Sequence, residues 1–364
     1  MRTLAFGLLS LLAVPTAVEA QTSDQASADT RRWEVEWYGG LSLANPSSGG
    51  TTTLPAPGAP LTTSSPIFPS RQVPSWFFGD GAMLLNDVNA AFGLANRLSP
   101  LDAGFDSLRF ESGGRAAFGI RVRHAMTPRV SIEVSVDAVP TAVRLPDGFI
   151  VAAESSRESF ESAIGALLSS GPFSNVVVSA TRATSEGSRR DLWAIAALNT
   201  HFKPRGLLVP YVTAGAGVAG VAGGTGNPPS VTLEGSYRFS ILGEVPIDET
   251  DRLTIRLERD TTFVAVVGGG LRRKISERWG LRLDGRVFVG PGGDRLRLDA
   301  TPASASAPPA GFIESFTHPS VQFSNHASTG RQSTLSAPPI QGFSVFESGL
   351  RTRILVTMGF FARF

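Results

Sequence analysis

The sequence of 364 residues predicts an all-β fold, an eight-stranded, antiparallel, up-and-down transmembrane β-barrel with long extracellular loops. Three observations predict it. Eight long segments alternate apolar residues with polar or small ones, the connections between these segments are short and long in turn, and aromatic residues gather at one end of the predicted strands. This combination is typical of chains that cross a membrane with strands.

The alternating segments are longer than the strands of soluble proteins. A soluble strand has about five or six residues, whereas a tilted transmembrane strand needs about 9 to 11. In the segment that starts at Trp279, Leu281 and Leu283 lie on one face, and Arg282 and Asp284 lie on the other. We expect the apolar face to contact lipid. The eight segments span 33–44, 113–124, 128–139, 190–203, 206–221, 261–274, 279–291 and 350–364.

The connections alternate strictly in length. Short turns near 125–127, 204–205 and 275–278 join segments two to three, four to five and six to seven. A transmembrane barrel has an even number of strands, with short turns at one end and long loops at the other. A soluble sandwich would have no reason to follow this order. The long connections, rich in Pro, Ser, Gly and Thr, are 45–112, 140–189, 222–260 and 292–348.

Parts of these loops show patterns of their own. Segments 229–242 and 252–262 alternate, which predicts a hairpin that extends strands five and six above the membrane; a ten-stranded barrel is the alternative. The pair Ser155 and Glu158 fits a capping box for a helix that ends at Gly171-Pro172. A second short helix is predicted by Leu84, Val88 and Phe92, which are spaced four residues apart.

The N-terminus has the pattern of a secretory signal peptide over residues 1–20, followed by a periplasmic segment at 21–32. Arg2 supplies the positive charge, Leu4 to Val14 form an apolar stretch, and Ala20 ends a small-residue cleavage site. The domain from 33 to 364 is then the barrel with its loops. A chain without cysteine has no disulfide or thiolate chemistry, and a net charge of +2 gives no basic face for nucleic acid.

Aromatic residues mark the end of the barrel that carries the short turns. Placed by those turns, Trp33, Phe202, Trp279, Phe360 and Phe364 lie together, as expected for a girdle at the lipid headgroups. With the signal peptide, the eight segments and the ending Phe360-Phe361-Ala362-Arg363-Phe364, the chain resembles the bacterial outer-membrane β-barrel family. It is most similar to small eight-stranded barrels like the transmembrane domain of outer-membrane protein A. The resemblance implies that the closing Phe364 is an assembly signal read by the barrel-assembly machinery.

In the segments 33–44, 113–124, 128–139 and 279–291, the charged residues fall on the face assigned to the lumen. An eight-stranded barrel has room only for its own side chains, and a charge left alone in a dry lumen costs several kcal/mol. We therefore expect a salt-bridged plug; the alternative is a narrow or gated pore with a slight preference for anions. The predicted lumen charge network is Glu34, Glu36, Arg115, Arg121, Arg123, Glu133, Asp137, Arg272, Arg282, Asp284, Arg286, Arg351 and Arg353, with Asp191 and Arg363 also assigned inward.

Catalytic chemistry has little support. The histidines His124, His201, His318 and His326 lack the spacing of metal ligands on one element. Lipid-modifying barrels need a base and a nucleophile near the outer rim. His318 and His326 lie in a serine-rich connection, where a serine next to a histidine is expected by chance. We expect no enzyme, no metal and no cofactor.

The sequence thus predicts a porin-like, monomeric barrel in the outer membrane of a Gram-negative cell envelope. We expect a structural or surface-interaction protein that acts through its surface loops. The alternative is a small gated pore or a lipid-modifying outer-membrane enzyme. The expected partners are outer-membrane lipid and, during biogenesis, the barrel-assembly machinery; an extracellular partner stays open, and nucleic acid is excluded.

Overall fold

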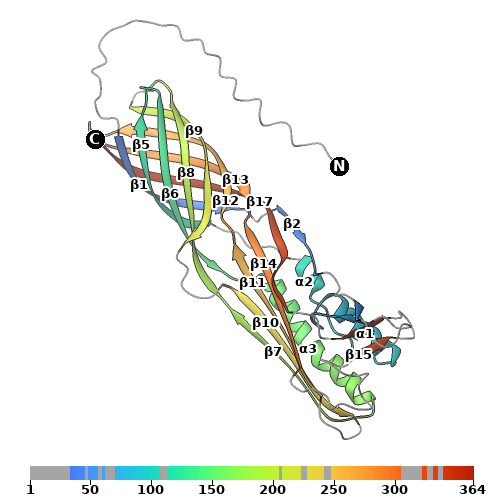
Figure 1. Cartoon of the computed structure of the whole chain (residues 1–364). Coiled ribbons are helices and arrows are strands. Elements are labelled where there is room, and N and C mark those ends of the chain that lie inside the picture. Colours follow the sequence, from blue (N-terminus) through green and yellow to red (C-terminus); the bar gives the residue numbers. More distant parts are fainter. Residues whose placement is uncertain are drawn as a thin grey trace.

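Eight strands close into an antiparallel barrel in the computed structural model (Figure 1). Each strand pairs with the next in the chain among the eight, and the first pairs with the last, so the sheet has no open edge. The predicted eight-stranded, up-and-down fold is confirmed, and the ten-stranded alternative is wrong. The strands are β1 (Trp33–Ala44), β5 (Gly114–Ala125), β6 (Val130–Val143), β8 (Gly187–His201), β9 (Leu208–Ala222), β12 (Thr262–Lys274), β13 (Trp279–Pro291) and β17 (Ile340–Arg363).

The structure describes residues 33–45, 48–55, 60–61, 70–106, 108, 114–204, 207–222, 228–241, 247–304, 322–325, 331–334 and 339–364. The predicted signal peptide and the segment 21–32 lie outside the described residues, as do His318 and His326. In the described part of the chain, no helix has the length and apolar character needed to cross a membrane.

The two faces of the barrel wall differ as the alternation predicts. On β13, Leu283 is 51% exposed while Asp284 is 2% exposed. On β17, Val356 and Met358 point outward and Thr357 is buried between them. The outer wall is therefore a continuous apolar surface, and the polar face of each strand is turned into the lumen.

The long connections build a second folded unit at the other end of the barrel from the short turns, here called the outer unit (Figure 1). Its main sheet follows the order β17-β14-β11-β10-β7, and β2 also pairs with β17. A small second sheet has the order β15-β16-β4-β3. The elements are β2 (Ser48–Thr52), β3 (Pro60–Leu61), β4 (Ser70–Gln72), α1 (Gly79–Ala91), α2 (Asp102–Asp106), α3 (Asp147–Ser170), β7 (Phe173–Ser185), β10 (Ser230–Ile241), β11 (Ile247–Arg259), β14 (Asp294–Ser304), β15 (Gln322–Asn325) and β16 (Arg331–Thr334).

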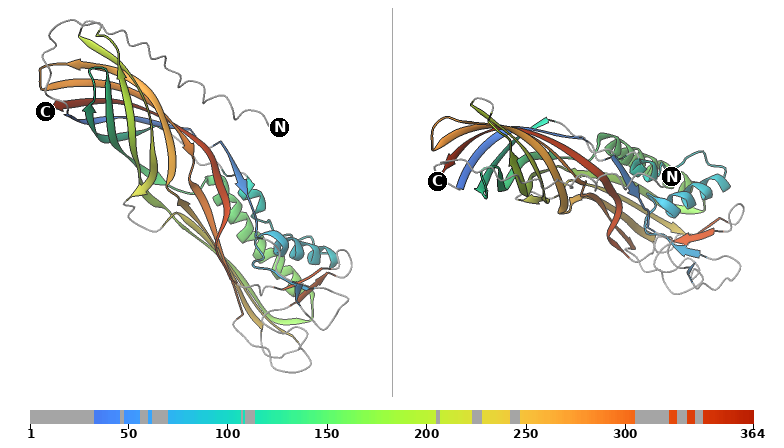
Figure 2. Two further views of the ribbon diagram at one scale, coloured as in Figure 1. Left: turned by 45° about the horizontal axis from the view of Figure 1, so that its top comes forward. Right: turned by 90° about the horizontal axis from the view of Figure 1, so that it is seen from above.

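The outer unit has a hydrophobic core of its own. The helices lie together on one side of the main sheet (Figure 2), and α3 packs on β7 and β10. Phe160 of α3 rests on Gly235 of β10, where a Cβ atom would come within 2.5 Å of the ring, so only glycine allows this approach. The core also contains Trp76, Phe77, Phe149, Ile164, Leu233, Tyr237, Leu253, Ile255, Leu296 and Leu298.

One expectation for the loops is incomplete and another needs correction. The predicted hairpin forms as β10 and β11, and it also pairs with β7 and β14, which the sequence did not predict. Its alternating apolar residues are buried under the helices, which explains the alternation seen in the sequence. The helix predicted from Ser155 begins earlier, at Asp147 after Pro146, because apolar residues from Phe149 onward already face the core.

One strand joins the barrel to the outer unit. β17 has 24 residues. Its part from Leu350 pairs with β13 in the barrel, and its part up to Glu347 pairs with β14 in the outer sheet. The two sheets are thus parts of one hydrogen-bonded ladder, which holds the outer unit at a defined place above the barrel mouth.

Candidate functional site

The centre of the barrel lumen contains three guanidinium groups and three carboxylates. Glu133 accepts a hydrogen bond from Arg282 at 2.6 Å and one from Arg286. Asp284 lies 2.7 Å from both Arg121 and Arg286. Glu36 completes the set, 3.3 Å from Arg121 and 3.1 Å from Arg282. The charges balance, as buried ion pairs require. We call Glu36, Arg121, Glu133, Arg282, Asp284 and Arg286 the central network.

Aromatic rings and small residues support this network. The Arg121 guanidinium lies 3.8 Å above the Tyr38 ring, and the Arg282 guanidinium lies 4.5 Å above the Tyr211 ring. The Tyr211 hydroxyl donates to Asp284 at 2.7 Å. Tyr38 donates to Asp137, and its ring occupies the space above Gly119, where a Cβ atom would lie 2.2 Å from the hydroxyl oxygen. Tyrosine thus fills the lumen and donates hydrogen bonds to two of its carboxylates.

A second cluster closes the end near the short turns. Glu34 lies 2.5 Å from Arg123, 2.5 Å from Arg272 and 3.1 Å from Arg363. Arg123 also lies 2.7 Å from His201 Nε2, which makes His201 part of the buried cluster. The groups together occupy the lumen between the central network and the aromatic end of the barrel.

An apolar layer lies between the central network and the outer mouth. It includes Trp193, Val264, Phe288 and Leu355. Arg353 is buried against this layer, with its guanidinium 4.5 Å from the Trp193 ring and 5.1 Å from the Phe288 ring. Its Nε donates to Ser42 at 2.7 Å.

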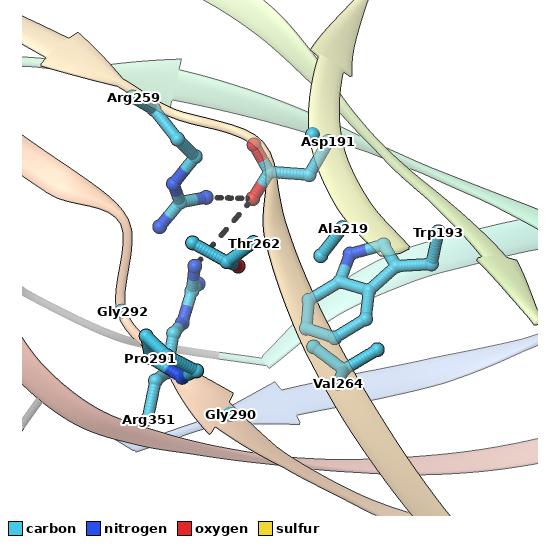
Figure 3. Close-up of a pocket in the computed structure, with 11 residues that line it drawn as sticks. Asp191, Trp193, Ala219, Arg259, Thr262, Val264, Gly290, Pro291, Gly292 and Arg351 are labelled. Atoms are coloured by element: carbon cyan, nitrogen blue, oxygen red, sulfur yellow. Dashed lines mark hydrogen bonds and ion pairs between the residues drawn. The ribbon is translucent and has the colours of Figure 1, made fainter. Parts of the chain in front are cut away.

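A small pocket remains at the outer mouth, with room for about one water molecule (Figure 3). Asp191 of β8 lies between Arg259 at 2.6 Å and Arg351 at 3.8 Å. Arg259 belongs to β11 of the outer sheet and also pairs with Asp294 of β14 at 2.8 Å. The outer unit therefore contributes side chains that close the barrel.

The predicted lumen residues fall into these layers, except Arg115. Arg115 lies opposite Ser42 near the outer mouth and is partly exposed. The sequence interpretation missed Tyr38 and Tyr211 as hydrogen-bond donors, and it missed Arg259 and Asp294 altogether. These two lie in connections treated as loops. The alternation of charged and apolar residues in 247–259 indicates a strand. It does not show which sheet that strand joins, so it could not identify Arg259.

The aromatic residues predicted as a girdle lie at the end with the short turns. Trp33 packs against His124 with ring centroids 4.4 Å apart, and Trp279 stacks on Phe360 at 4.9 Å. The rings of Trp33, Trp279, Phe360, Phe202 and Phe364 are exposed on the barrel surface. An amphipathic ring at this position suits the boundary between acyl chains and headgroups.

The outer unit contains a second polar cluster, buried beneath its helices. Asp251 of β11 is fully buried, and its Oδ2 accepts hydrogen bonds from the Ser75 hydroxyl at 2.9 Å and the Trp76 backbone N–H at 2.6 Å. Burial raises the pKa of Asp251 to about 7. Burial beside Glu249 also raises the pKa of Tyr237, whose hydroxyl donates to Glu249 and accepts from Trp76 Nε1. The cluster fastens the segment before α1 to the sheet.

The opposite face of the outer sheet is open and polar. Arg252 pairs with Glu234 at 2.5 Å across β10 and β11, and Arg256 pairs with Asp299 at 2.7 Å across β11 and β14. Thr232 and Thr254 hydrogen-bond at 3.1 Å between them. This face thus presents paired charges and hydroxyl groups to the solvent.

No family model and no curated protein matches the chain. Among solved structures it is similar to Ail, the attachment invasion locus protein of Yersinia pestis, with 6% identity and a TM-score of 0.28 over 92% of this chain and 99% of that one. The CymD monoaromatic hydrocarbon channel has 10% identity and a TM-score of 0.20, covering 92% and 89%. A Pseudomonas aeruginosa FadL homologue has 6% identity and a TM-score of 0.18, over 91% of this chain and 90% of that one. Scores this low carry no argument about function.

Proposed function

We propose that this chain, whose fold is an eight-stranded outer-membrane-type β-barrel, is a closed anchor that presents the outer unit at the cell surface for interaction with other molecules. Residues 1–20 would direct its export and the barrel would lie in the outer membrane of a Gram-negative cell. The apolar outer wall, with Leu283 and Met358 among its exposed residues, supports the membrane location.

The filled lumen is the observation that carries this proposal. Ion pairs at both ends and at the centre, with an apolar layer between, occupy the space that a pore would need. The outer unit, in contrast, has its own core and an open polar face. Because the long connections form one folded unit at the surface, interaction with other molecules is favoured over transport. Segments held above a rigid scaffold are the usual place for binding.

Conductance tests the closed barrel. The purified chain, added to planar lipid bilayers, should insert without a steady ion current, because buried paired side chains leave no water-filled path. A porin added to the same bilayer serves as the positive control. A steady current from the inserted wild-type chain would contradict the closed anchor and favour the gated pore.

Labelling of intact cells tests whether the outer unit lies at the cell surface. Since the chain has no cysteine, single cysteines report position without background. Thr181→Cys on β7 should react with a membrane-impermeant maleimide on intact cells, whereas Pro128→Cys in a short turn should react only after lysis; both side chains are exposed. If Pro128→Cys reacts on intact cells and Thr181→Cys does not, the short turns face the outside of the cell and the proposed orientation is wrong.

The proposal includes no catalytic role. If the chain modified lipid, overexpression would change the lipid A profile of the cells. We expect an unchanged profile by mass spectrometry, and a new lipid species that disappears in cells with an empty vector would favour the enzyme.

A further inference from the structure

The three short turns expose similar kinds of side chain. Each has at least one large apolar residue and one basic residue exposed at the end of the barrel that lies away from the outer unit. The apolar side chains are 55%, 69% and 60% exposed in chain order. We call this set the short-turn rim: Met126 with Arg129, Leu207 with Lys203, and Ile275 with Arg278.

Two of the turns have the same hydrogen bonds although 149 positions separate them in the sequence. Val130 O accepts from Met126 N at 3.0 Å, and Trp279 O accepts from Ile275 N at 3.0 Å. In each turn the second residue is a hydroxyl residue, Thr127 or Ser276, whose oxygen accepts backbone N–H groups two and three residues later. The shared geometry places the apolar first residue and the arginine fourth residue in the same relation to the barrel wall.

The charge of these turns is strongly one-sided. Turns 126–129, 202–207 and 275–278 contain the bases Arg129, Lys203, Arg205 and Arg278 and a single acid, Glu277. Among the described residues, the side chains of Arg129, Lys203 and Arg278 form no ion pair. Arg273, at the end of β12, adds an exposed guanidinium on the same outward face as Leu271.

The rim continues the aromatic girdle. Trp279 follows the third turn directly and stacks on Phe360, and Phe202 precedes Lys203 in the second. Going down the outer wall, the surface passes from aliphatic to aromatic and then to mixed apolar and basic residues. This order matches the transition from acyl chains through the interface to the phosphate groups of a bilayer, where long basic side chains reach the phosphates.

We propose that the short-turn rim binds the headgroups of anionic phospholipids in the adjoining leaflet, with Met126, Leu207 and Ile275 dipping toward the acyl chains and Arg129, Lys203 and Arg278 contacting phosphate. The distribution around the barrel fits lipid, which surrounds the barrel on all sides, better than a protein that would dock on one side. The inference rests on the proposed membrane location. It adds a lipid class and the residues that select it.

Lipid retention tests the proposal. The full chain is inserted into vesicles of phosphatidylcholine mixed with phosphatidylglycerol and extracted gently, and the retained lipids are counted by native mass spectrometry. The wild type should retain phosphatidylglycerol preferentially. Arg129→Gln, Lys203→Gln and Arg278→Gln combined should reduce this preference by roughly fivefold for each basic residue removed, because a basic group near an anionic surface contributes about that factor.

The matched control removes three arginines from the open face of the outer sheet: Arg238→Gln, Arg252→Gln and Arg256→Gln. It changes the net charge equally and should retain the wild-type preference. An unchanged preference in the rim variant, or an equal loss in the control, would overturn the proposal. Binding of the wild type to purified peptidoglycan that is lost in the rim variant would assign the rim to the cell wall instead.

Flotation of the vesicles separates this inference from the function on which it rests. Wild-type chain that floats with vesicles but shows no preference for phosphatidylglycerol contradicts the rim proposal alone. Wild-type chain that floats with neither lipid contradicts the membrane location, and both proposals are then wrong.

Discussion

Glu133 lies close to all three guanidinium groups of the central network, those of Arg282, Arg286 and Arg121. Glu133→Gln would leave three buried guanidinium groups with two carboxylates. Removing one member of a buried ion pair typically costs about 3 to 5 kcal/mol, because an uncompensated charge stays in the interior. We expect the temperature at which the barrel unfolds in detergent, followed by its shift in electrophoretic mobility, to fall clearly.

Glu258→Gln is the control for this change. Glu258 pairs with Arg297 at 3.5 Å on the open face of the outer sheet, and exposed pairs contribute about 0 to 1 kcal/mol. Its loss should leave the unfolding temperature of the barrel close to that of the wild type. Equal effects of the two substitutions would mean that the lumen is wet and that the central network does not hold the barrel together.

Asp251 makes the outer unit sensitive to pH. Because the pKa of Asp251 is about 7 in the folded unit and about 4 in an unfolded chain, the folded state binds the proton more tightly. The stability that this group contributes is fully present below about pH 4 and is lost as the pH rises through 7. We expect the outer unit of the wild type to lose up to about 4 kcal/mol between these limits from this group.

Asp251→Asn should remove that pH dependence. Both hydrogen bonds from the 75–76 segment end on one carboxylate oxygen, so an amide oxygen in that place would keep them. Unfolding of the outer unit, followed by tryptophan fluorescence at pH 5 and pH 8, should differ less in the variant than in the wild type. Parallel pH profiles for the two chains would contradict a buried, titrating Asp251.

At the scale of elements, the free edge of the outer sheet is covered by a helix. Among the described residues, β7 pairs only with β10 in the main sheet, so its other side would expose backbone groups. Glu161 of α3 accepts a hydrogen bond from Ala180 N–H at 2.8 Å, and Arg157 donates to Ala180 O at 3.4 Å. Side chains of α3 therefore occupy the backbone groups that a second chain would need.

Arg157→Ala combined with Glu161→Ala should open this edge. We expect a larger fraction of dimers or higher oligomers in size-exclusion chromatography with light scattering, because unpaired strand edges pair with one another. Glu158→Ala, on the neighbouring exposed position, leaves both contacts to Ala180 in place and should stay like the wild type. A double variant that remains monomeric at every concentration would show that the edge is protected by other means.

The elements also show which parts of the fold the sequence can predict. The barrel strands were predictable because each has one lipid face and one lumen face, so apolar residues recur at every second position and Leu283 and Asp284 separate clearly. The lumen charges follow from the same alternation. The outer unit has no such local pattern, since its core joins distant segments: Trp76 contacts Tyr237, and Ser75 contacts Asp251.

Arg259 at the barrel mouth could not be predicted from the sequence for the same reason. It lies at the end of β11, whose alternation is that of a strand in either sheet. Only the pairing of β11 with β14 places Arg259 between Asp191 and Asp294. A residue that closes the lumen from a neighbouring sheet leaves no periodic pattern in the sequence.

For the whole molecule, two sheets with opposite requirements share one strand. The barrel wall needs apolar residues outside and charges inside, whereas the outer unit buries its apolar face under helices and turns charges to water. β17 serves both, and its pairing changes from β13 to β14 near Leu350. The same substitution of an exposed apolar residue should therefore cost stability in the barrel wall and have little effect in the outer unit.

Leu283→Arg and Val177→Arg test that difference. Leu283 is 51% exposed on the barrel wall and Val177 is 61% exposed on β7, so neither substitution creates a cavity or a clash in a core. In a membrane the first places a charge among acyl chains near the middle of β13, which costs about 2 to 4 kcal/mol. The second places a charge in water and should change stability by about 0.5 kcal/mol or less.

Both variants are compared with the wild type by their folding into lipid vesicles across a urea series. The measured quantity is the fraction of chain that has the electrophoretic mobility of the folded barrel. We expect the midpoint of Leu283→Arg to move to lower urea and that of Val177→Arg to stay at the wild-type value. If both variants fold like the wild type, the barrel wall does not contact lipid. If Val177→Arg is the weaker folder, lipid surrounds the outer unit, and the orientation argued from the short turns is wrong.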